Sequence, residues 1–289
     1  MSPGIIYAIL TSICFGITGV VDKIGVSQVN NPLVFSLQST SVAIIITTFI
    51  AVIFFNTSLA KELKSIKRSI WFYVILVGIF SSGIFVVFRF IGLIQTTGTF
   101  ANLTQIITTS LTAIFAWIFL RERLPKKFWY LFVIILIATY FVSIGHIRLA
   151  SISQGDMYII FGTLFLASGN IFSKLAAGRV HPIILSMARF FFGGIVILVV
   201  NIFLFDQNLM TQPFVGWALI SGLLWSGNVI FFHLALTQIG VTLTTSILMI
   251  GPIYTMILES VFLSQVFTPV QIVAAFIVIS CGLLIIRLK

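Results

Sequence analysis

The sequence predicts an all-α integral membrane protein with ten transmembrane helices, arranged as two inverted five-helix repeats. Three observations support this fold class. The chain has 289 residues, of which 60% are hydrophobic and only 8% are charged. Its apolar residues form blocks of roughly 20 residues, the length that an α-helix needs to cross a bilayer. Finally, short motifs of the first half recur in the second half in the same order.

The helices follow from the apolar blocks and from the polar or proline-containing segments between them, because proline and asparagine often begin or end helices. In the first half we expect helices at Pro3–Val21, Leu33–Phe55, Ile70–Phe90, Thr97–Leu120 and Phe128–Gly145. In the second half we expect them at Asp156–Leu175, Ile183–Phe205, Pro213–Leu236, Val241–Ser264 and Pro269–Ile286.

The repeat divides the chain at residue 150, into 1–150 and 151–289. The motif Gly78-x₃-Ser82-Gly83-x₄-Phe88 returns as Gly222-x₃-Ser226-Gly227-x₄-Phe232. A unit of five helices crosses the membrane an odd number of times, so its second copy enters from the other side. Inverted repeats of this kind commonly hold a binding site between them.

Orientation is predicted from Lys and Arg, which favour the cytoplasmic side of a membrane. One face of the predicted bundle carries most of them, and the other face has only Lys23, Arg89 and Arg148 near its helix ends. The sequence therefore predicts a multi-pass protein of the cell membrane with both termini in the cytoplasm. The cations that determine this are Lys61, Lys64, Lys67, Arg68, Arg121, Arg123, Lys126, Lys127, Arg179, Arg287 and Lys289.

Several short motifs resemble the ten-helix, EamA-type exporter branch of the drug/metabolite transporter superfamily. They are Gly16-x₆-Lys23, Pro32, Leu120-Arg121-Glu122-Arg123-Leu124, Lys174, Pro182-x₆-Arg189 and Gly251-Pro252. The resemblance implies a transporter that exports a metabolite through a cavity between two five-helix halves. Two features depart from the family pattern: Gln38 and Ser39 stand where the first domain often has arginine, and Gln265 replaces the counterpart of Glu122.

Charged or titratable residues inside apolar helices are candidates for gating, because a charge at the bilayer centre costs about 2.5–3.5 kcal/mol on insertion scales. These residues are Arg89, Lys174, Arg189, His233 and Glu259.

Each of these residues also has a structural interpretation. Arg89 and His233 are equivalent in the repeat and are interpreted as parts of opposite gates; alternatively, Arg89 reaches the interface and His233 only packs. Lys174 caps a helix or contacts substrate, and Arg189 forms a structural ion pair or carbonyl contact. Glu259 carries a coupling proton or bonds a neighbouring helix.

Residues that are mostly polar recur at helical spacing and predict a wet cavity lining. Thr11, Phe15, Thr18 and Asp22 form one stripe, and Asn102, Gln105, Thr109 and Thr112 form another. For any single one of the Ser, Thr or Asn residues, the structural interpretation is an interhelical hydrogen bond, and it is the several residues on one stripe that favour a cavity lining. The predicted substrate-binding residues are Thr11, Phe15, Gln38, Ser82, Asn102, Gln105, Asn170, Trp225 and Asn228.

Taken together, these features predict a secondary transporter that exports an amino acid or a related small metabolite by alternating access. Cations outnumber carboxylates in the spans, which indicates a substrate with an anionic group. The alternatives are a quaternary-amine, nucleobase or drug transporter of the same fold, or a polytopic membrane enzyme. No catalytic residues, metal, cofactor or nucleic-acid partner are expected. A monomer in contact with membrane lipids is expected, because one chain supplies both halves.

Overall fold

The computed structural model describes residues 2–121, 124–145, 152–176, 178–205 and 213–287, and the elements formed by these residues are all helices. Glu122, Arg123, Arg148 and Lys289 lie outside the described residues. Within them, 8 helices are long and apolar enough to cross a membrane, and Pro269–Ile285 is a shorter apolar helix. The predicted fold class, an all-helical membrane protein, is confirmed.

The first half contains five membrane segments in its described residues: α1 (Pro3–Ser27), α2 (Pro32–Phe55), a composite third segment, α6 (Gly98–Leu120) and α7 (Lys126–Ile144). The third segment is built from α4 (Arg68–Val77), η2 (Gly78–Ile84) and α5 (Phe85–Leu93). Two short helices, η1 (Asn56–Ser58) and α3 (Leu59–Ser65), connect α2 to α4 and were not predicted.

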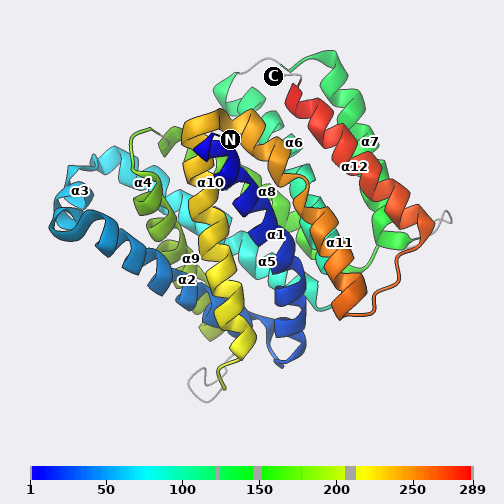
Figure 1. Cartoon of the computed structure of the whole chain (residues 1–289), viewed down its shortest axis with the longest axis horizontal. Helices are drawn as coiled ribbons and strands as arrows, with labels where there is room; N and C mark the ends of the chain where they lie inside the picture. Colours follow the sequence, from blue (N-terminus) through cyan, green and yellow to red (C-terminus); the bar gives the residue numbers. More distant parts are fainter. Residues whose placement is uncertain (1, 122–123, 146–151, 177, 206–212, 288–289) are drawn as a thin grey trace.

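The described residues of the second half form α8 (Gln154–Ala176), α9 (Pro182–Phe205), α10 (Gly216–Leu248), α11 (Gly251–Phe262) and α12 (Pro269–Arg287). In Figure 1, α1 begins and α12 ends at the same end of the bundle, here called the termini end. The third segment of the first half begins at the termini end, whereas its counterpart α10 begins at the opposite end (Figure 1). The two halves therefore run in opposite directions.

Two predicted helix boundaries were wrong in ways that matter for the site. The first helix was expected to end at Val21, but it continues to Ser27, so Asp22 and Lys23 lie within it. A break was also expected between Leu236 and Val241, but α10 runs through it. Instead, the break falls just before Gly251-Pro252, because proline has no N–H to bond the preceding helical turn, whereas polar residues and one glycine are tolerated inside a helix.

The two halves interlock instead of forming separate bundles. Helix α1 packs mainly on α10 and α11 of the second half, and Figure 1 shows it lying beside both. Its counterpart α8 packs on α6 and on the composite third segment of the first half. Similarly, η2 packs on α9 while α10 packs on α2. This exchange of contacts is what an inverted repeat produces when each half completes the packing of the other.

The composite third segment contains a π-helical stretch at η2, which places one copy of the repeated motif in a different backbone conformation from the other. The first copy of the motif begins in η2, whereas the second copy, Gly222 to Phe232, lies inside the continuous α10. The backbones of η2 and α9 approach closely: a Cβ atom added to Gly193 would lie 2.5 Å from the Cβ of Ser82. Because π-helical turns are frequent at functional sites, this stretch marks a place to search for one.

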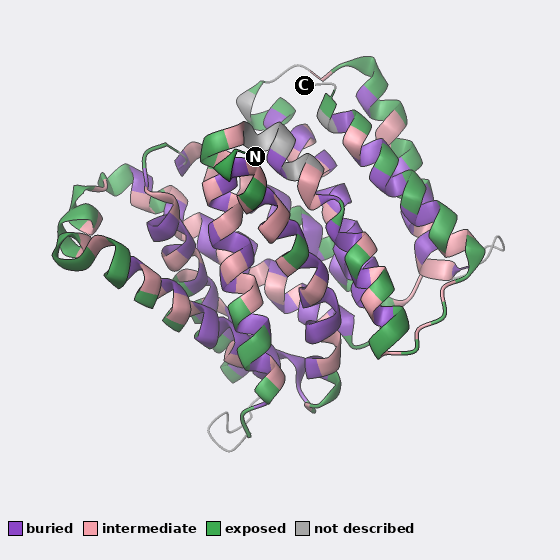
Figure 2. Ribbon diagram, in the orientation of Figure 1, coloured by how far each residue is buried: buried purple, intermediate pink, exposed green. Residues whose placement is uncertain are grey.

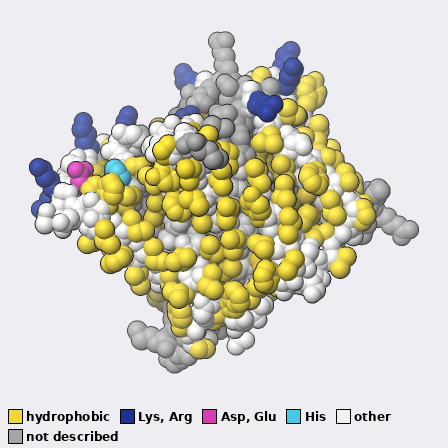
Figure 3. Space-filling view, in the orientation of Figure 1, with side chains coloured by type: hydrophobic (Ala, Val, Ile, Leu, Met, Phe, Trp, Pro, Cys, Tyr) yellow, Lys and Arg dark blue, Asp and Glu magenta, His cyan; other side chains and the backbone are white. Residues whose placement is uncertain are grey.

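The surface and the interior divide as expected for a protein in a bilayer. Buried residues concentrate on the faces that the helices turn toward one another (Figure 2). Large apolar side chains such as Phe49, Phe119, Tyr130 and Phe203 are exposed. On the face drawn in Figure 3, apolar side chains cover the middle of the molecule, and Lys and Arg gather at the termini end. The exposed apolar surface is therefore suited to contact with lipid.

Candidate functional site

A small cavity lies at the meeting point of the two halves, where α1, α5, α6, α8, α9, α10 and α11 converge. Its volume is about 90 Å³, enough for a few water molecules. Ligand pockets for small organic molecules are usually about 300–1,000 Å³, so a metabolite requires the cavity to widen. Its lining residues include Phe15, Phe85, Asn102, Gln105, Thr109, Asn170, Arg189, Trp225, Asn228, Phe232 and Pro252.

Most of the residues predicted to bind substrate lie in this lining. They are Phe15, Asn102, Gln105, Asn170, Trp225 and Asn228, contributed by both halves. The predicted stripe on α6 reaches the cavity through Asn102, Gln105 and Thr109, and Thr112 accepts a hydrogen bond from Asn170 Nδ2 at 3.2 Å. The helical spacing thus correctly predicted which face of α6 lines the cavity. The role of these residues in binding stays a prediction.

The other three residues in the predicted substrate-binding set lie outside this lining. Thr11 is fully buried, and its backbone carbonyl accepts a hydrogen bond from Asn228 Nδ2. Gln38 holds the start of α10: its Nε2 donates to the carbonyl of Pro213 and its Oε1 accepts from the amide of Val215.

Ser82 lines a second, smaller cavity of about 20 Å³, and its hydroxyl accepts a 2.8 Å hydrogen bond from Arg189 Nε.

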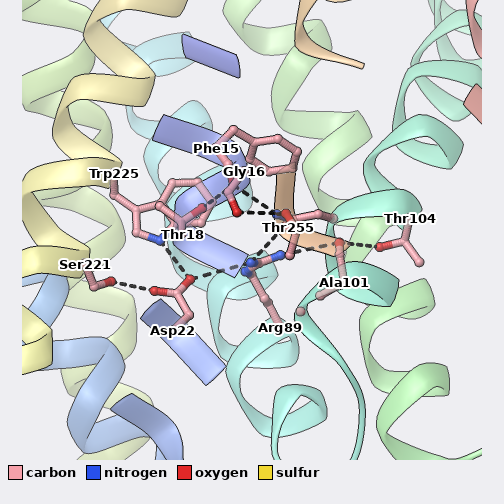
Figure 4. Close-up of polar contacts among 12 residues, drawn as sticks. Phe15, Gly16, Thr18, Asp22, Arg89, Ala101, Thr104, Ser221, Trp225 and Thr255 are labelled. Atoms are coloured by element: carbon pink, nitrogen blue, oxygen red, sulfur yellow. Dashed lines mark hydrogen bonds and ion pairs between the residues drawn. The ribbon is translucent and has the colours of Figure 1, made fainter. Parts of the chain in front are cut away.

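A buried ion pair lies next to the cavity, toward the end opposite the termini. Arg89 Nη2 is 3.5 Å from Asp22 Oδ2, and both side chains have no exposed surface. Ser221 Oγ donates to Asp22 Oδ1 at 2.6 Å, and Trp225 Nε1 donates to Asp22 Oδ2 at 3.1 Å (Figure 4). Arg89 therefore does not reach the membrane interface, which corrects one of its two predicted interpretations.

Sequence reasoning missed this pair because the first helix was expected to end before Asp22. The signal lay in the predicted stripe itself, in which Asp22 follows Thr11, Phe15 and Thr18 by one more helical turn. An acidic and a basic residue that both lie within apolar helices are each costly alone, so pairing them is the expected solution.

Asn102 connects the ion pair to the cavity wall. Its Oδ1 accepts a hydrogen bond from Arg89 Nη2 at 3.1 Å. Its Nδ2 donates to the carbonyl of Phe15 at 2.9 Å and to Thr255 Oγ1 at 2.8 Å. Figure 4 shows the guanidinium of Arg89 close to Asp22 and to the carbonyl of Ala101. One network thus joins α1, α5, α6, α10 and α11 beneath the cavity.

The remaining candidate charges have different surroundings. Glu259 accepts hydrogen bonds from the backbone amides of Gly98 and Thr99, at 2.6 and 2.9 Å, and so caps the N-terminus of α6. Lys23 Nζ donates to the carbonyls of Leu93 and Ile94, at 2.6 and 3.1 Å, where α5 ends. Both contacts hold helices together at the end opposite the termini, and neither Glu259 nor Lys23 is in the cavity lining.

Toward the termini end, His233 is buried and shares a 2.8 Å hydrogen bond with Ser186 Oγ. Lys174 is exposed. Arg189 is half-buried and lines both cavities. Arg89 and His233, equivalent in the repeat, therefore lie on opposite sides of the cavity but in unlike surroundings: one belongs to an ion-pair network and the other to a single hydrogen bond.

Two oppositely directed repeats that interlock around a polar cavity, inside an apolar shell, define a polytopic membrane transporter. The sequence model of the EamA-like transporter family matches residues 2–144 and again residues 153–288. The chain belongs to this family, as the sequence motifs predicted. No curated protein matches the chain.

Solved structures support the fold. One described as "Crystal structure of protein" is 15% identical in sequence, with a TM-score of 0.66 over 100% of this chain and 99% of the other. At that identity the likeness shows a shared fold. The same architecture therefore recurs over the whole length of a distant chain.

Proposed function

We propose that this protein is a secondary transporter that moves a small organic metabolite, an amino acid or a related compound, across the cell membrane by alternating access. The repeats 1–150 and 151–289 are proposed to rearrange around the central cavity. The observation that carries this proposal is the cavity itself: it lies between the halves and takes its lining from both. Inverted repeats with a site between them are the usual construction of such transporters.

The surroundings of the cavity support a conformational cycle. Toward the end opposite the termini, the Asp22–Arg89 pair, the Glu259 cap and the Lys23 contacts close the helices together. A cavity of about 90 Å³ is too small for most metabolites, so this arrangement is proposed to be a closed state. Opening requires some of these contacts to break, and substrate binding supplies part of the free energy.

The direction of transport is proposed to be export, following the resemblance to EamA-type exporters. The termini are proposed to be cytoplasmic because the exposed Lys and Arg gather at the termini end (Figure 3). Transport is further proposed to be coupled to a proton. The protein is proposed to act as a monomer, because one chain already supplies both repeats.

Thiol labelling tests alternating access directly. Gln105→Cys, in a background with Cys14 and Cys281 replaced by alanine, puts a reporter in the cavity lining. An impermeant thiol reagent is expected to label it from inside-out vesicles and from right-side-out vesicles. Thr47→Cys, fully buried in α2 away from the cavity, is the matched control and should resist labelling from both sides. Labelling of Gln105→Cys from one side only would contradict alternating access.

Transport itself is tested in proteoliposomes loaded with a mixture of amino acids, carboxylates, nucleobases and quaternary amines. Counterflow of a labelled solute identifies the substrate, and repeating the assay with an imposed pH gradient tests proton coupling. Absence of counterflow for every class, with folded protein in the vesicles, would overturn the transport proposal.

A further inference from the structure

Arg189 is the charged residue in the described lining of the central cavity, and it has no acidic partner there. In the described part of the chain, the one ion pair within 4 Å joins Asp22 to Arg89. Glu259 is bonded to the backbone at the start of α6. The cavity therefore carries one unbalanced positive charge. A charge in such a position is costly and marks a substrate pathway in membrane proteins.

The guanidinium of Arg189 is held in place by one hydrogen bond, and its other donors are not used by described residues. Its Nε donates to Ser82 Oγ at 2.8 Å, and Ser82 is fixed by the close contact between η2 and Gly193 of α9. No other hydrogen bond of Arg189 to a described residue occurs, so its two Nη groups are available. A guanidinium held in this way presents a planar fork, which matches the geometry of a carboxylate.

The rest of the lining supplies apolar and neutral polar surface. Phe15, Phe85, Trp225 and Phe232 provide aromatic rings from both halves. Trp225 is held by its Nε1 bond to Asp22 and by Arg89, whose Cζ lies 5.4 Å from its ring centroid. The side chain of Gln105 faces the cavity and forms no hydrogen bond with described residues. No carboxylate lines the described cavity that could balance an ammonium group.

We infer that the transported solute is a monocarboxylate with an apolar, preferably aromatic body, and that Arg189 binds its carboxylate. This inference rests on the proposed transport function and, among the substrates proposed there, selects carboxylates that are related to amino acids but lack the ammonium group. It favours anions over zwitterions, and zwitterions over amines, because the cavity already holds one positive charge and no negative one. A quaternary amine is accordingly the least suitable of the substrates considered above.

A charge series on one molecular body tests the inference without any mutation. Phenylpropionate, phenylpropanol and phenylpropylamine share the ring and chain and differ in charge. Binding to the purified full-length chain is measured by ligand-dependent thermal stabilisation and by calorimetry. We expect phenylpropionate to bind about 10- to 100-fold more tightly than phenylpropanol, the size of a hydrogen bond to a charged group, and the amine to bind most weakly. Equal affinities for acid and alcohol would overturn the inference.

Variants test whether Arg189 causes the preference for the acid over the alcohol. Arg189→Gln should bring the affinities for acid and alcohol to within about threefold of each other, and Arg189→Lys should keep part of the preference because it keeps the charge. Arg179→Gln removes a cation from the exposed connection before α9 and should leave the preference intact. An undiminished preference in Arg189→Gln would remove Arg189 from the proposal. If Arg189→Gln does not fold, a reduced but not abolished preference in Arg189→Lys supports the assignment, and an unchanged preference opposes it.

The same probes separate this inference from the transport function. Counterflow of phenylpropylamine or phenylpropanol in preference to phenylpropionate would overturn the substrate class while leaving transport established. Tight, Arg189-dependent binding of phenylpropionate without movement of any solute would support the binding site and overturn transport.

Discussion

Asp22 and Arg89 form an ion pair of 3.5 Å in the interior of the membrane domain, and neither side chain has any exposed surface. The two residues come from α1 and α5; Arg89 also bonds Asn102 of α6, and Asp22 also bonds Ser221 of α10. Since a charge buried in an apolar medium is costly without a partner, the pair couples the positions of these helices. Separating them requires either a new partner for each charge or the entry of water.

Removing one charge of this pair should lower the unfolding free energy more than removing both charges. Asp22→Asn leaves Arg89 buried without its counter-ion, and we expect a loss of about 3–5 kcal/mol in unfolding free energy. The double variant Asp22→Asn, Arg89→Gln leaves neither charge unpaired and should lose less than Asp22→Asn alone and less than Arg89→Gln alone. Thermal unfolding in detergent measures all three. Strictly additive losses would show that the two charges do not depend on each other.

Close packing of η2 on α9 predicts that Gly193 does not tolerate even one extra carbon. In Gly193→Ala, the new Cβ would meet Ser82 Cβ at 2.5 Å and its backbone oxygen at 2.7 Å. We expect a loss of about 1–3 kcal/mol, typical of overpacking, together with weaker phenylpropionate binding because Ser82 orients Arg189.

Gly216→Ala is the matched control for this prediction, because a Cβ there has nothing within 4 Å. Its unfolding temperature and ligand affinity should equal those of the wild type. Equal behaviour of the two variants would mean that the backbones are not in close contact in the working protein.

The contacts of Glu259 predict a structural role at the start of α6. Glu259→Gln keeps an oxygen for one backbone amide but removes the charge that both amides and the helix dipole favour, so we expect a loss of about 0.5–2 kcal/mol. Glu62→Gln changes an exposed carboxylate in α3 and is the control. If transport depends on a pH gradient, Glu259→Gln should retain that dependence, and its disappearance would identify Glu259 as the proton carrier.

Orientation in the membrane can be measured at two exposed positions. Ser65→Cys lies at the end of α3, among the basic residues, and Gln28→Cys follows α1 at the opposite end. With Cys14 and Cys281 replaced by alanine, we expect an impermeant reagent to label Gln28→Cys in intact cells and Ser65→Cys only after permeabilisation. The reverse pattern would place the termini outside the cytoplasm.

Local features of the chain were largely predictable from sequence. The positions of Asn31 and Pro32 predicted the start of α2, where Asn31 Oδ1 accepts a hydrogen bond from the amide of Leu33. The spacing of Asn102, Gln105 and Thr109 correctly grouped them on one face of α6. Both results follow from interactions between residues a few positions apart, which a single sequence records.

Helix boundaries and the contacts between side chains of different helices were less predictable. The glycine and polar residues before Val241 were taken as a break, although the backbone bonds of α10 continue through them. The roles of Glu259 and Arg189 depended on whether a partner from another helix stood nearby. Glu259 meets Gly98 and Thr99, more than 150 positions away in the chain, and Arg189 meets Ser82.

The sequence by itself determined that this chain is a membrane protein of two inverted five-helix repeats, because the lipid solvent requires apolar helices of a set length and an odd-numbered repeat must invert. Tertiary structure alone decided which charges neutralise one another and which is left facing the cavity. Asp22 pairs with Arg89 and leaves Arg189 without an acidic partner among the described residues. The reason is physical: hydropathy and helical period act along one chain segment, whereas electrostatic pairing depends on distances between segments that only packing fixes.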